Sequence, residues 1–304
     1  YATGHSIEEI NQIALTTKWD EIFGTAQKRK QLYYFNKQDS DNYQLSFSLK
    51  NLKPIAPISL SSGQYSYEHL SDIFINYSNA PNYDNLVIPF RCNATNLITG
   101  EEIIFKNGSI PKILRISSSI PTVFSPLEHQ NDLLVDGGLI NNLPTNLAKD
   151  LGADYIIASN VMSPEKSKDD INDVFSVIYR LINFYGEKNE SENIKKSDLL
   201  INPSFKAISV INADPMALKI IKKEGKKAAH QHINQFIALS DTNPLDSSFM
   251  TLTSIESNEI KINSIILNKD LLKDPLTNKF FHNDMIVTKD NLINHIREIR
   301  QSNK

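Results

Sequence analysis

The stretch DLLVDGGLINNLPTNLAKDLGADYIIASNV, residues 132–161, decides the fold class of this chain. An apolar strand, Leu133–Val135, ends in Asp136, and a second apolar strand follows at Tyr155–Ser159. The segment between the two strands has the length of a short helix. This order predicts a βαβ unit of a parallel α/β sheet, in which the second strand is buried on both faces. Asp136 would then lie beyond a strand end, where parallel α/β sheets keep their chemistry.

Gly137 and Gly138 follow Asp136 directly and indicate a tight turn. Glycine permits positive φ and close backbone approach, and we expect both properties to matter beside this carboxylate. An aspartate in this position can orient or deprotonate a nucleophile, hold a metal, or only shape the turn, since Asp-Gly is a favoured turn dipeptide. The residue pattern alone leaves these three roles open.

The helix between the two strands has recognisable ends. Asn142 is its candidate cap, and Pro144 stands near its first turn, where the missing N–H costs nothing. Gly152 supplies the residue that stops it.

Composition limits the class of protein. The chain has 304 residues, 40% of them hydrophobic, and a net charge of −3, which argues against a nucleic-acid surface. Cys92 is the only cysteine, so no intrachain disulfide is expected. No apolar run approaches the roughly 18 residues that span a bilayer.

Further elements follow from periodicity and turn residues. A capping box at Ser6–Glu9 opens a helix whose apolar face continues through Trp19, Ile22 and Phe23. The other predicted helices are Tyr67–Tyr77, Ile110–Ser118, Ile171–Tyr185, a basic-faced helix from Pro215 to Phe236, and Asp290–Arg300. The other predicted strands are two within Leu32–Leu49, then Leu86–Thr95, Glu101–Phe105, Leu199–Ile201 and Glu259–Leu267; Gly186–Lys196 is expected to be a charged, mobile segment and Ser240–Ser248 a linker.

Several segments together resemble the second half of the patatin-like phospholipase catalytic domain. From Ile88 the chain reads IPFRCNATNLITGEEIIF, and from Ser109 it reads SIPKILRISSSIPTVFSPLEHQNDLLVDGGLINNLP. The opening YATGHSIEEI is similar to the sequence that follows the family's nucleophile helix, and KNLKPIAPISLSSGQ resembles bacterial outer-membrane members. The resemblance extends over residues 1–239 and implies a three-layer α/β/α sheet.

The resemblance implies a serine lipid acyl hydrolase. In that family a serine on a G-x-S-x-G elbow attacks the ester, and the D-G-G aspartate, here Asp136 with Gly137 and Gly138, is its only side-chain partner. A glycine-rich loop supplies the oxyanion-hole N–H groups. Lipid or phospholipid esters would be the substrates, at a membrane surface, and no cofactor, metal or nucleic acid is implied.

This chain contains no G-x-S-x-G and no glycine-rich oxyanion loop. Ser117, Ser118 and Ser119 belong to a segment that the family uses structurally, and His230 and His232 are expected to be a solvated pair, not metal ligands. We therefore expect the nucleophile in a part of the protein before Tyr1, and the 304 residues alone to be inactive.

Residues 240–304 resemble part of a POTRA-like α+β module, which implies a periplasmic or outer-membrane protein; a cytoplasmic one is the alternative. Two other functions stay open. The chain could be a non-catalytic patatin-fold module that binds lipid or a partner, or an unrelated doubly wound domain in which Asp136 holds a metal or a ribose.

Overall fold

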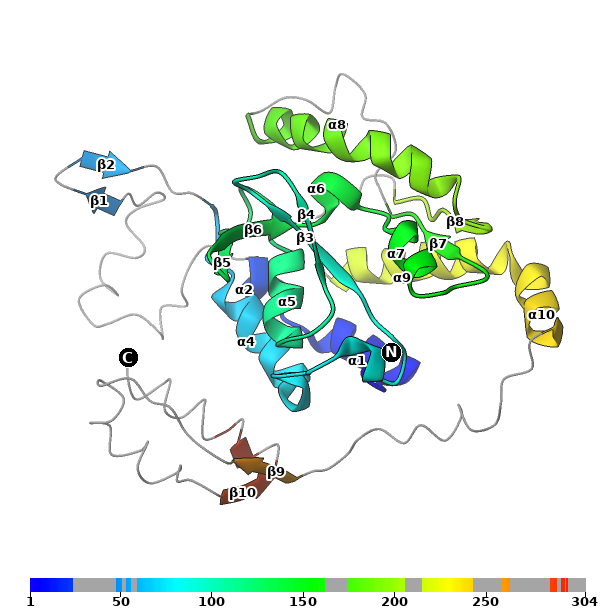
Figure 1. Cartoon of the computed structure of the whole chain (residues 1–304), viewed down its shortest axis with the longest axis horizontal. Helices are drawn as coiled ribbons and strands as arrows, with labels where there is room; N and C mark the ends of the chain where they lie inside the picture. The colour runs from blue at the N-terminus through cyan, green and yellow to red at the C-terminus, as the bar shows by residue number, and fades with distance from the viewer. Residues whose placement is uncertain are drawn as a thin grey trace.

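The structure is a computed structural model that describes residues 1–23, 48–50, 53–55, 59–161, 174–205, 215–242, 259–262, 285–288, 291–292 and 294. The described part is a mixed α/β fold, as predicted, with helices packed around a four-stranded sheet (Figure 1).

The central sheet has the strand order β4-β3-β6-β5. Its strands are β3 (Cys92–Asn96), β4 (Glu102–Phe105), β5 (Leu127–His129) and β6 (Asp132–Asp136). Every pair in it is antiparallel, and Ala94 of β3 stands opposite Asp136 of β6.

The parallel βαβ unit predicted around Asp136 is therefore wrong for β6, which pairs antiparallel with β3 and β5. The cause is a hairpin that the sequence reading missed. Gln130 and Asn131 join β5 to β6 with φ values of 50° and 72°. Two successive positive φ angles are typical of the tight turns that connect antiparallel strands.

The second predicted strand does pair in parallel, but with a different partner. β7 (Ile157–Ser159) lies alongside β8 (Leu199–Ile201). Ala158 is buried, whereas Ile157 is 47% exposed. The expectation that this strand is buried on both faces is thus wrong, because only its central residue points inward.

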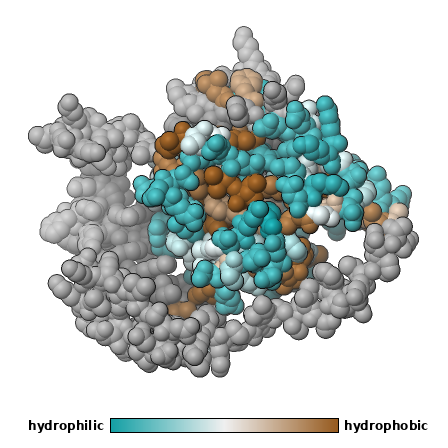
Figure 2. All heavy atoms as spheres, viewed as in Figure 1, coloured by the Kyte–Doolittle hydropathy of each residue, from teal (hydrophilic) through white to brown (hydrophobic). Residues whose placement is uncertain are grey.

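Helix α5 (Ile110–Ser117) packs on the sheet and forms the main core with it. The Ser109 hydroxyl caps the helix by accepting the Lys112 N–H, and Pro111 stands in the first turn. The buried cluster combines residues of α5 and the sheet with the segment before β3: Ala80, Tyr83, Ala94, Phe105, Ile110, Ile113, Ile116 and Leu134. On the face shown in Figure 2, apolar residues also gather in the middle, between hydrophilic ones.

The amino-terminal helices are α1 (Ile7–Thr16) and α2 (Trp19–Phe23). The predicted capping box is confirmed, since Ser6 and Glu9 exchange side-chain and backbone hydrogen bonds. The predicted single helix divides at Thr17, which has extended backbone angles and whose hydroxyl donates to the Ile13 carbonyl at 2.6 Å. Helix α4 (Gln64–Ile73) packs against both α2 and α5.

Helix α8 (Val174–Ile194) is longer than predicted. It includes Gly186, the start of the segment expected to be mobile. Gly186 is buried, and a Cβ on it would lie 2.9 Å from the Gly138 carbonyl oxygen. The missing side chain therefore lets α8 pack closely against the turn that follows Asp136, which explains why the helix does not end at this glycine.

The remaining helices are α6 (Gly138–Asn141), α7 (Thr145–Asp150), α9 (Pro215–His230) and α10 (Ile233–Thr242), with 3₁₀ turns at Ile75–Tyr77 and Tyr83–Asn85. The predicted helix from Pro215 is thus interrupted after His230. Two further antiparallel pairs join β1 (Ser48–Lys50) to β2 (Lys53–Ile55) and β9 (Glu259–Ile262) to β10 (Met285–Thr288). No helix of the described residues is long and apolar enough to cross a membrane.

Some predictions lie outside the described residues. These are most of the two strands within residues 32–49, the linker beyond Thr242, and most of the helix predicted at 290–300. The division into a catalytic domain and a POTRA-like module stays a prediction. The strand expected to begin at Glu259 is present as β9.

Candidate active site at Asp136

The Asp136 carboxylate is held by the turn that follows it. Its Oδ1 atom accepts the Gly138 N–H at 2.7 Å, and its own backbone N–H donates to the Ser119 carbonyl at 3.1 Å. No other hydrogen bond to this carboxylate occurs among the described residues. One carboxylate oxygen is thus fixed by the turn, and the other has no hydrogen-bond partner among the described residues.

Burial raises the pKa of Asp136 from 3.8 to about 6, although the Gly138 N–H opposes this rise. Cys92, in the same sheet, is also affected: burial and the nearby Asp136 charge raise the pKa of its thiol. A carboxylate with a pKa near 6 is ionised at neutral pH yet basic enough to accept a proton from a hydroxyl.

Gly137 and Gly138 are required for close approach, not for positive φ. Gly137 has a φ of −68°, and neither glycine is among the residues with positive φ. A Cβ on Gly137 would lie 2.6 Å from the Asn93 carbonyl oxygen, and one on Gly138 would lie 2.6 Å from Asn142 Oδ1. The expectation of close backbone approach is confirmed, and the expectation of positive φ is wrong because the turn continues directly into helix α6.

Asn142 does not cap the predicted helix. It stands at the carboxyl end of α6, a short helix that the sequence reading did not anticipate. Helix α7 begins at Thr145 after Pro144, and no side chain caps it. Gly152 does end α7 with a φ of 90°, as predicted.

A buried group of amide side chains surrounds α6. Asn141 Nδ2 donates to Glu102 Oε1 at 2.8 Å and to Asn146 Oδ1 at 3.0 Å, while its Oδ1 accepts from Asn193 Nδ2 at 2.8 Å. Asn93 Nδ2 also donates to Glu102 Oε1, at 2.8 Å. Sequence reasoning missed this group, and the only signal was the Asn-Asn pair that follows the two glycines.

The serines at the end of α5 were expected to be structural, and the hydroxyls of Ser118 and Ser119 donate to carbonyls of the same helix. Ser119 is fully buried, and its Oγ accepts from Arg115 Nη1 at 2.6 Å. The buried Arg115 also donates to the carbonyls of Ser62, Gly63 and Ser125. No serine hydroxyl contacts the Asp136 carboxylate within the described residues.

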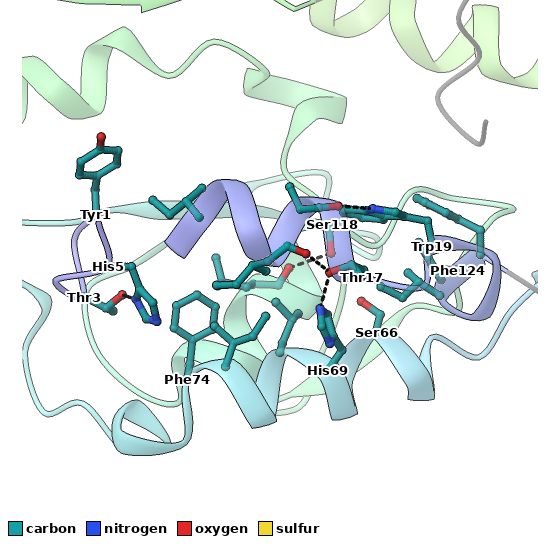
Figure 3. Close-up of a pocket in the computed structure, with 18 of the residues that line it drawn as sticks. Tyr1, Thr3, His5, Thr17, Trp19, Ser66, His69, Phe74, Ser118 and Phe124 are labelled. Atoms are coloured by element: carbon teal, nitrogen blue, oxygen red, sulfur yellow. Dashed lines mark hydrogen bonds between the residues drawn. The ribbon is translucent and has the colours of Figure 1, made fainter. Parts of the chain in front are cut away.

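An apolar cavity of 560 Å³ lies between α1, α2, α4 and the end of α5 (Figure 3). At one wall the Thr17 hydroxyl and His69 Nε2 are 2.8 Å apart. Because the single Thr17 hydroxyl proton goes to the Ile13 carbonyl, His69 Nε2 must be the donor. Ser118 lines the cavity, and the next residue, Ser119, carries the carbonyl that binds the Asp136 N–H.

The two histidines predicted to be a solvated pair, His230 and His232, lie at and just after the end of α9. His230 ends α9 and is exposed, and His232 Nδ1 lies 2.7 Å from Gln235 Oε1. Among the described residues no three His, Cys, Asp or Glu side chains are grouped so that they could hold a metal ion.

Comparison with known proteins bears on the segment that contains this site. Residues 2–149 match the family model described as patatin-like phospholipase. This segment, about half of the chain, is similar to members of that family. The match includes the Asp136 turn, helix α5 and the four-stranded sheet of this patatin-like segment.

Relatives of the patatin-like segment are much longer proteins. An uncharacterized NTE family protein of Mycobacterium tuberculosis is 46% identical over 54 residues, which is 18% of this chain and 9% of the relative. Lysophospholipase NTE1 of Scheffersomyces stipitis is 31% identical over 108 residues, 35% of this chain and 7% of the relative. Lysophospholipase NTE1 of Debaryomyces hansenii is 28% identical over 134 residues, 43% of this chain and 8% of the relative. The matched part thus covers less than a tenth of each of these relatives.

Proposed function

We propose that this chain is part of a lipid acyl hydrolase of the phospholipase A or esterase type, in which Asp136 is the base that activates a serine. The observation that carries the proposal is the Asp136 carboxylate itself. It has one oxygen fixed by the Gly138 N–H and one without a hydrogen-bond partner among the described residues. Its pKa of about 6 suits proton transfer at neutral pH.

In the proposed reaction, the serine Oγ attacks the ester carbonyl while the free oxygen of Asp136 takes the hydroxyl proton. The proton then passes to the leaving alcohol, and an acyl-enzyme remains for water to hydrolyse. A second proton acceptor such as histidine is not needed, because the carboxylate can contact the serine directly. We place the serine and the oxyanion donors before Tyr1, since residues 1–304 contain no G-x-S-x-G elbow.

The family match and the two fungal relatives, whose names are lysophospholipases, support an ester-linked lipid as the substrate. The apolar cavity supports the same class, because its lining is that of a site for an aliphatic chain. We propose that this cavity contributes to the wall that receives the acyl group.

The proposal is tested on the intact protein with a fluorophosphonate probe, which modifies only an activated serine. The expected result is one labelled serine, located by peptide mapping in a G-x-S-x-G sequence before Tyr1, together with release of fatty acid from phosphatidylcholine or lysophosphatidylcholine vesicles. Absence of labelling together with absence of fatty-acid release would overturn the proposal and favour the non-catalytic, lipid-binding alternative.

A further inference from the structure

Both amide protons and the amide oxygen of Asn141 are hydrogen-bonded inside the fold. Asn141 is buried, both Nδ2 protons have acceptors (Glu102 Oε1 and Asn146 Oδ1), and Oδ1 accepts from Asn193 Nδ2. One side chain thereby connects β4, α7 and α8 to the last residue of α6. A buried polar group with three hydrogen bonds favours a single arrangement, because displacement leaves donors or acceptors unpaired.

Glu102 is the second residue whose hydrogen bonds hold α6 in place. Its Oε1 accepts two amide protons, from Asn93 and Asn141, both at 2.8 Å, and no Lys or Arg pairs with it within the described residues. The carboxylate therefore acts as an acceptor that joins strand β3 to helix α6. Asn93 completes the link, because its Nδ2 also donates to the Asn141 carbonyl at 2.9 Å.

These bonds converge on the turn that orients Asp136. The Asn141 N–H donates to the Gly137 carbonyl at 2.9 Å, which closes the helical turn beginning at Gly138. Asn93 precedes Ala94, the residue that stands opposite Asp136 in the sheet. The group thus fixes α6 relative to the strand beside Asp136, and the direction of the Gly138 N–H depends on the position of α6.

We infer that Asn141, supported by Glu102, is a positioning residue for the proposed base: it holds α6 so that the Gly138 N–H fixes one carboxylate oxygen of Asp136 and leaves the other directed at the reacting group. This inference rests on the proposed function for its catalytic meaning. Its structural part, the control of the Asp136 carboxylate by Asn141, stands independently of activity.

The test compares four variants of the intact protein. Asn141→Ala removes the central amide, and Glu102→Ala removes the shared acceptor. Glu102→Gln keeps an acceptor oxygen in the same place and is the conservative rescue. Asn160→Ala is the matched control: Asn160 is similarly buried, follows β7, and its Nδ2 donates to Glu190 of α8 at 2.7 Å, so the variant removes a buried amide that is bound to α8 at a different residue from the one that Asn141 contacts.

Two measurements distinguish positioning from general stability. In NMR spectra, the ¹³Cγ titration of Asp136 should move to higher pH in Asn141→Ala and Glu102→Ala, because the Gly138 N–H that favours the charged form is lost. Among the described residues, the Cys92 thiol has a pKa that the Asp136 charge raises, so its titration is followed in the same samples. Glu102→Gln and Asn160→Ala should leave the Asp136 titration unchanged.

In ester hydrolysis, kcat should fall roughly 10- to 100-fold in Asn141→Ala and Glu102→Ala with little change in KM, as expected when a reacting group is misplaced. Glu102→Gln should restore most of the loss. If Asn141→Ala does not fold, the inference is tested by comparing Glu102→Ala with Glu102→Gln.

An Asp136 titration that is the same in Glu102→Ala and in the wild type would overturn the inference. So would an equal loss of kcat in Asn160→Ala, since that would reflect stability alone. If the wild-type protein hydrolyses no ester but the Asp136 titration shifts as expected, the positioning role holds and the proposed function fails.

Discussion

The Gly138 N–H donates to Oδ1 of Asp136 across 2.7 Å, so the residue that begins helix α6 also orients the carboxylate that precedes it. The orientation is therefore a property of the helix start, and no cation contributes to it among the described residues. The same N–H also favours the charged form of the carboxylate, against the effect of burial.

The pH dependence of hydrolysis should reflect the opposing effects of burial and the Gly138 N–H on the pKa of Asp136. If Asp136 must be ionised to accept the serine proton, kcat/KM should fall below a midpoint near pH 6, because burial raises the pKa of Asp136 to about 6. The measurement is a pH–rate profile on a soluble ester whose own ionisation is constant over pH 4–8. A profile that is flat down to pH 4.5 would contradict the assignment.

Stability should depend on pH in the opposite sense to that of an ion-paired aspartate. Below pH 3.8 the Asp136 carboxyl is protonated in both folded and unfolded chains, and burial carries no charge penalty. Between 3.8 and about 6 only the unfolded chain ionises, so the folded state loses relative stability, by at most about 3 kcal/mol. Asp136→Asn has no such loss. Urea unfolding at pH 4 and pH 7 should therefore show that the free energy of unfolding of Asp136→Asn rises relative to that of the wild type as pH rises. The same difference in free energy of unfolding at both pH values would exclude the raised pKa.

Gly137 should not tolerate even one methyl group. The added Cβ would lie 2.6 Å from the Asn93 carbonyl oxygen, which is backbone and cannot move aside cheaply. We expect Gly137→Ala to lower the free energy of unfolding by about 1–3 kcal/mol and to reduce hydrolysis as well. Gly225→Ala is the control, because Gly225 lies inside α9 with no atom near its Cβ position, and alanine there should stabilise the helix. Chemical denaturation of the two variants checks both signs.

Arg115 should be essential for folding and only indirectly for chemistry. Its guanidinium donates to three carbonyls and to Ser119 Oγ, and a lysine cannot reach all four acceptors. We expect Arg115→Lys to cost about 2–4 kcal/mol of stability. Arg91→Lys, at a partly exposed pair with Asp84, should lose much less. Equal thermal denaturation midpoints for the two variants would show that the Arg115 acceptors are readily satisfied in other ways.

Structural features that depend on neighbouring residues could be predicted from the sequence, whereas features that depend on tertiary contacts could not. The Ser6 capping box and the Gly152 helix stop depend on residues within one turn, and both are present. The Gln130–Asn131 hairpin was missed because neither residue is a glycine, although asparagine is enriched at positive φ angles. That omission made a parallel β6 look plausible.

The candidate site, too, could be predicted from the sequence only in part. Asp136 and its glycines were visible as a motif, but the need for Gly137 comes from Asn93, 44 positions earlier in the chain. Asn141 meets partners on three other elements, and no spacing in the sequence connects them. The raised pKa of Asp136 likewise depends on burial by the fold, which a linear pattern does not express.

The central claim is that Asp136 accepts a proton from a nucleophilic serine, and Asp136→Asn in the intact protein tests it most directly. Asparagine keeps the shape of the side chain and an oxygen for the Gly138 N–H, but it cannot act as the base. We predict that kcat/KM for phospholipid or ester hydrolysis falls by at least about 10³-fold, with a thermal denaturation midpoint at pH 7 no lower than that of the wild type. Turnover within tenfold of the wild type would contradict the claim.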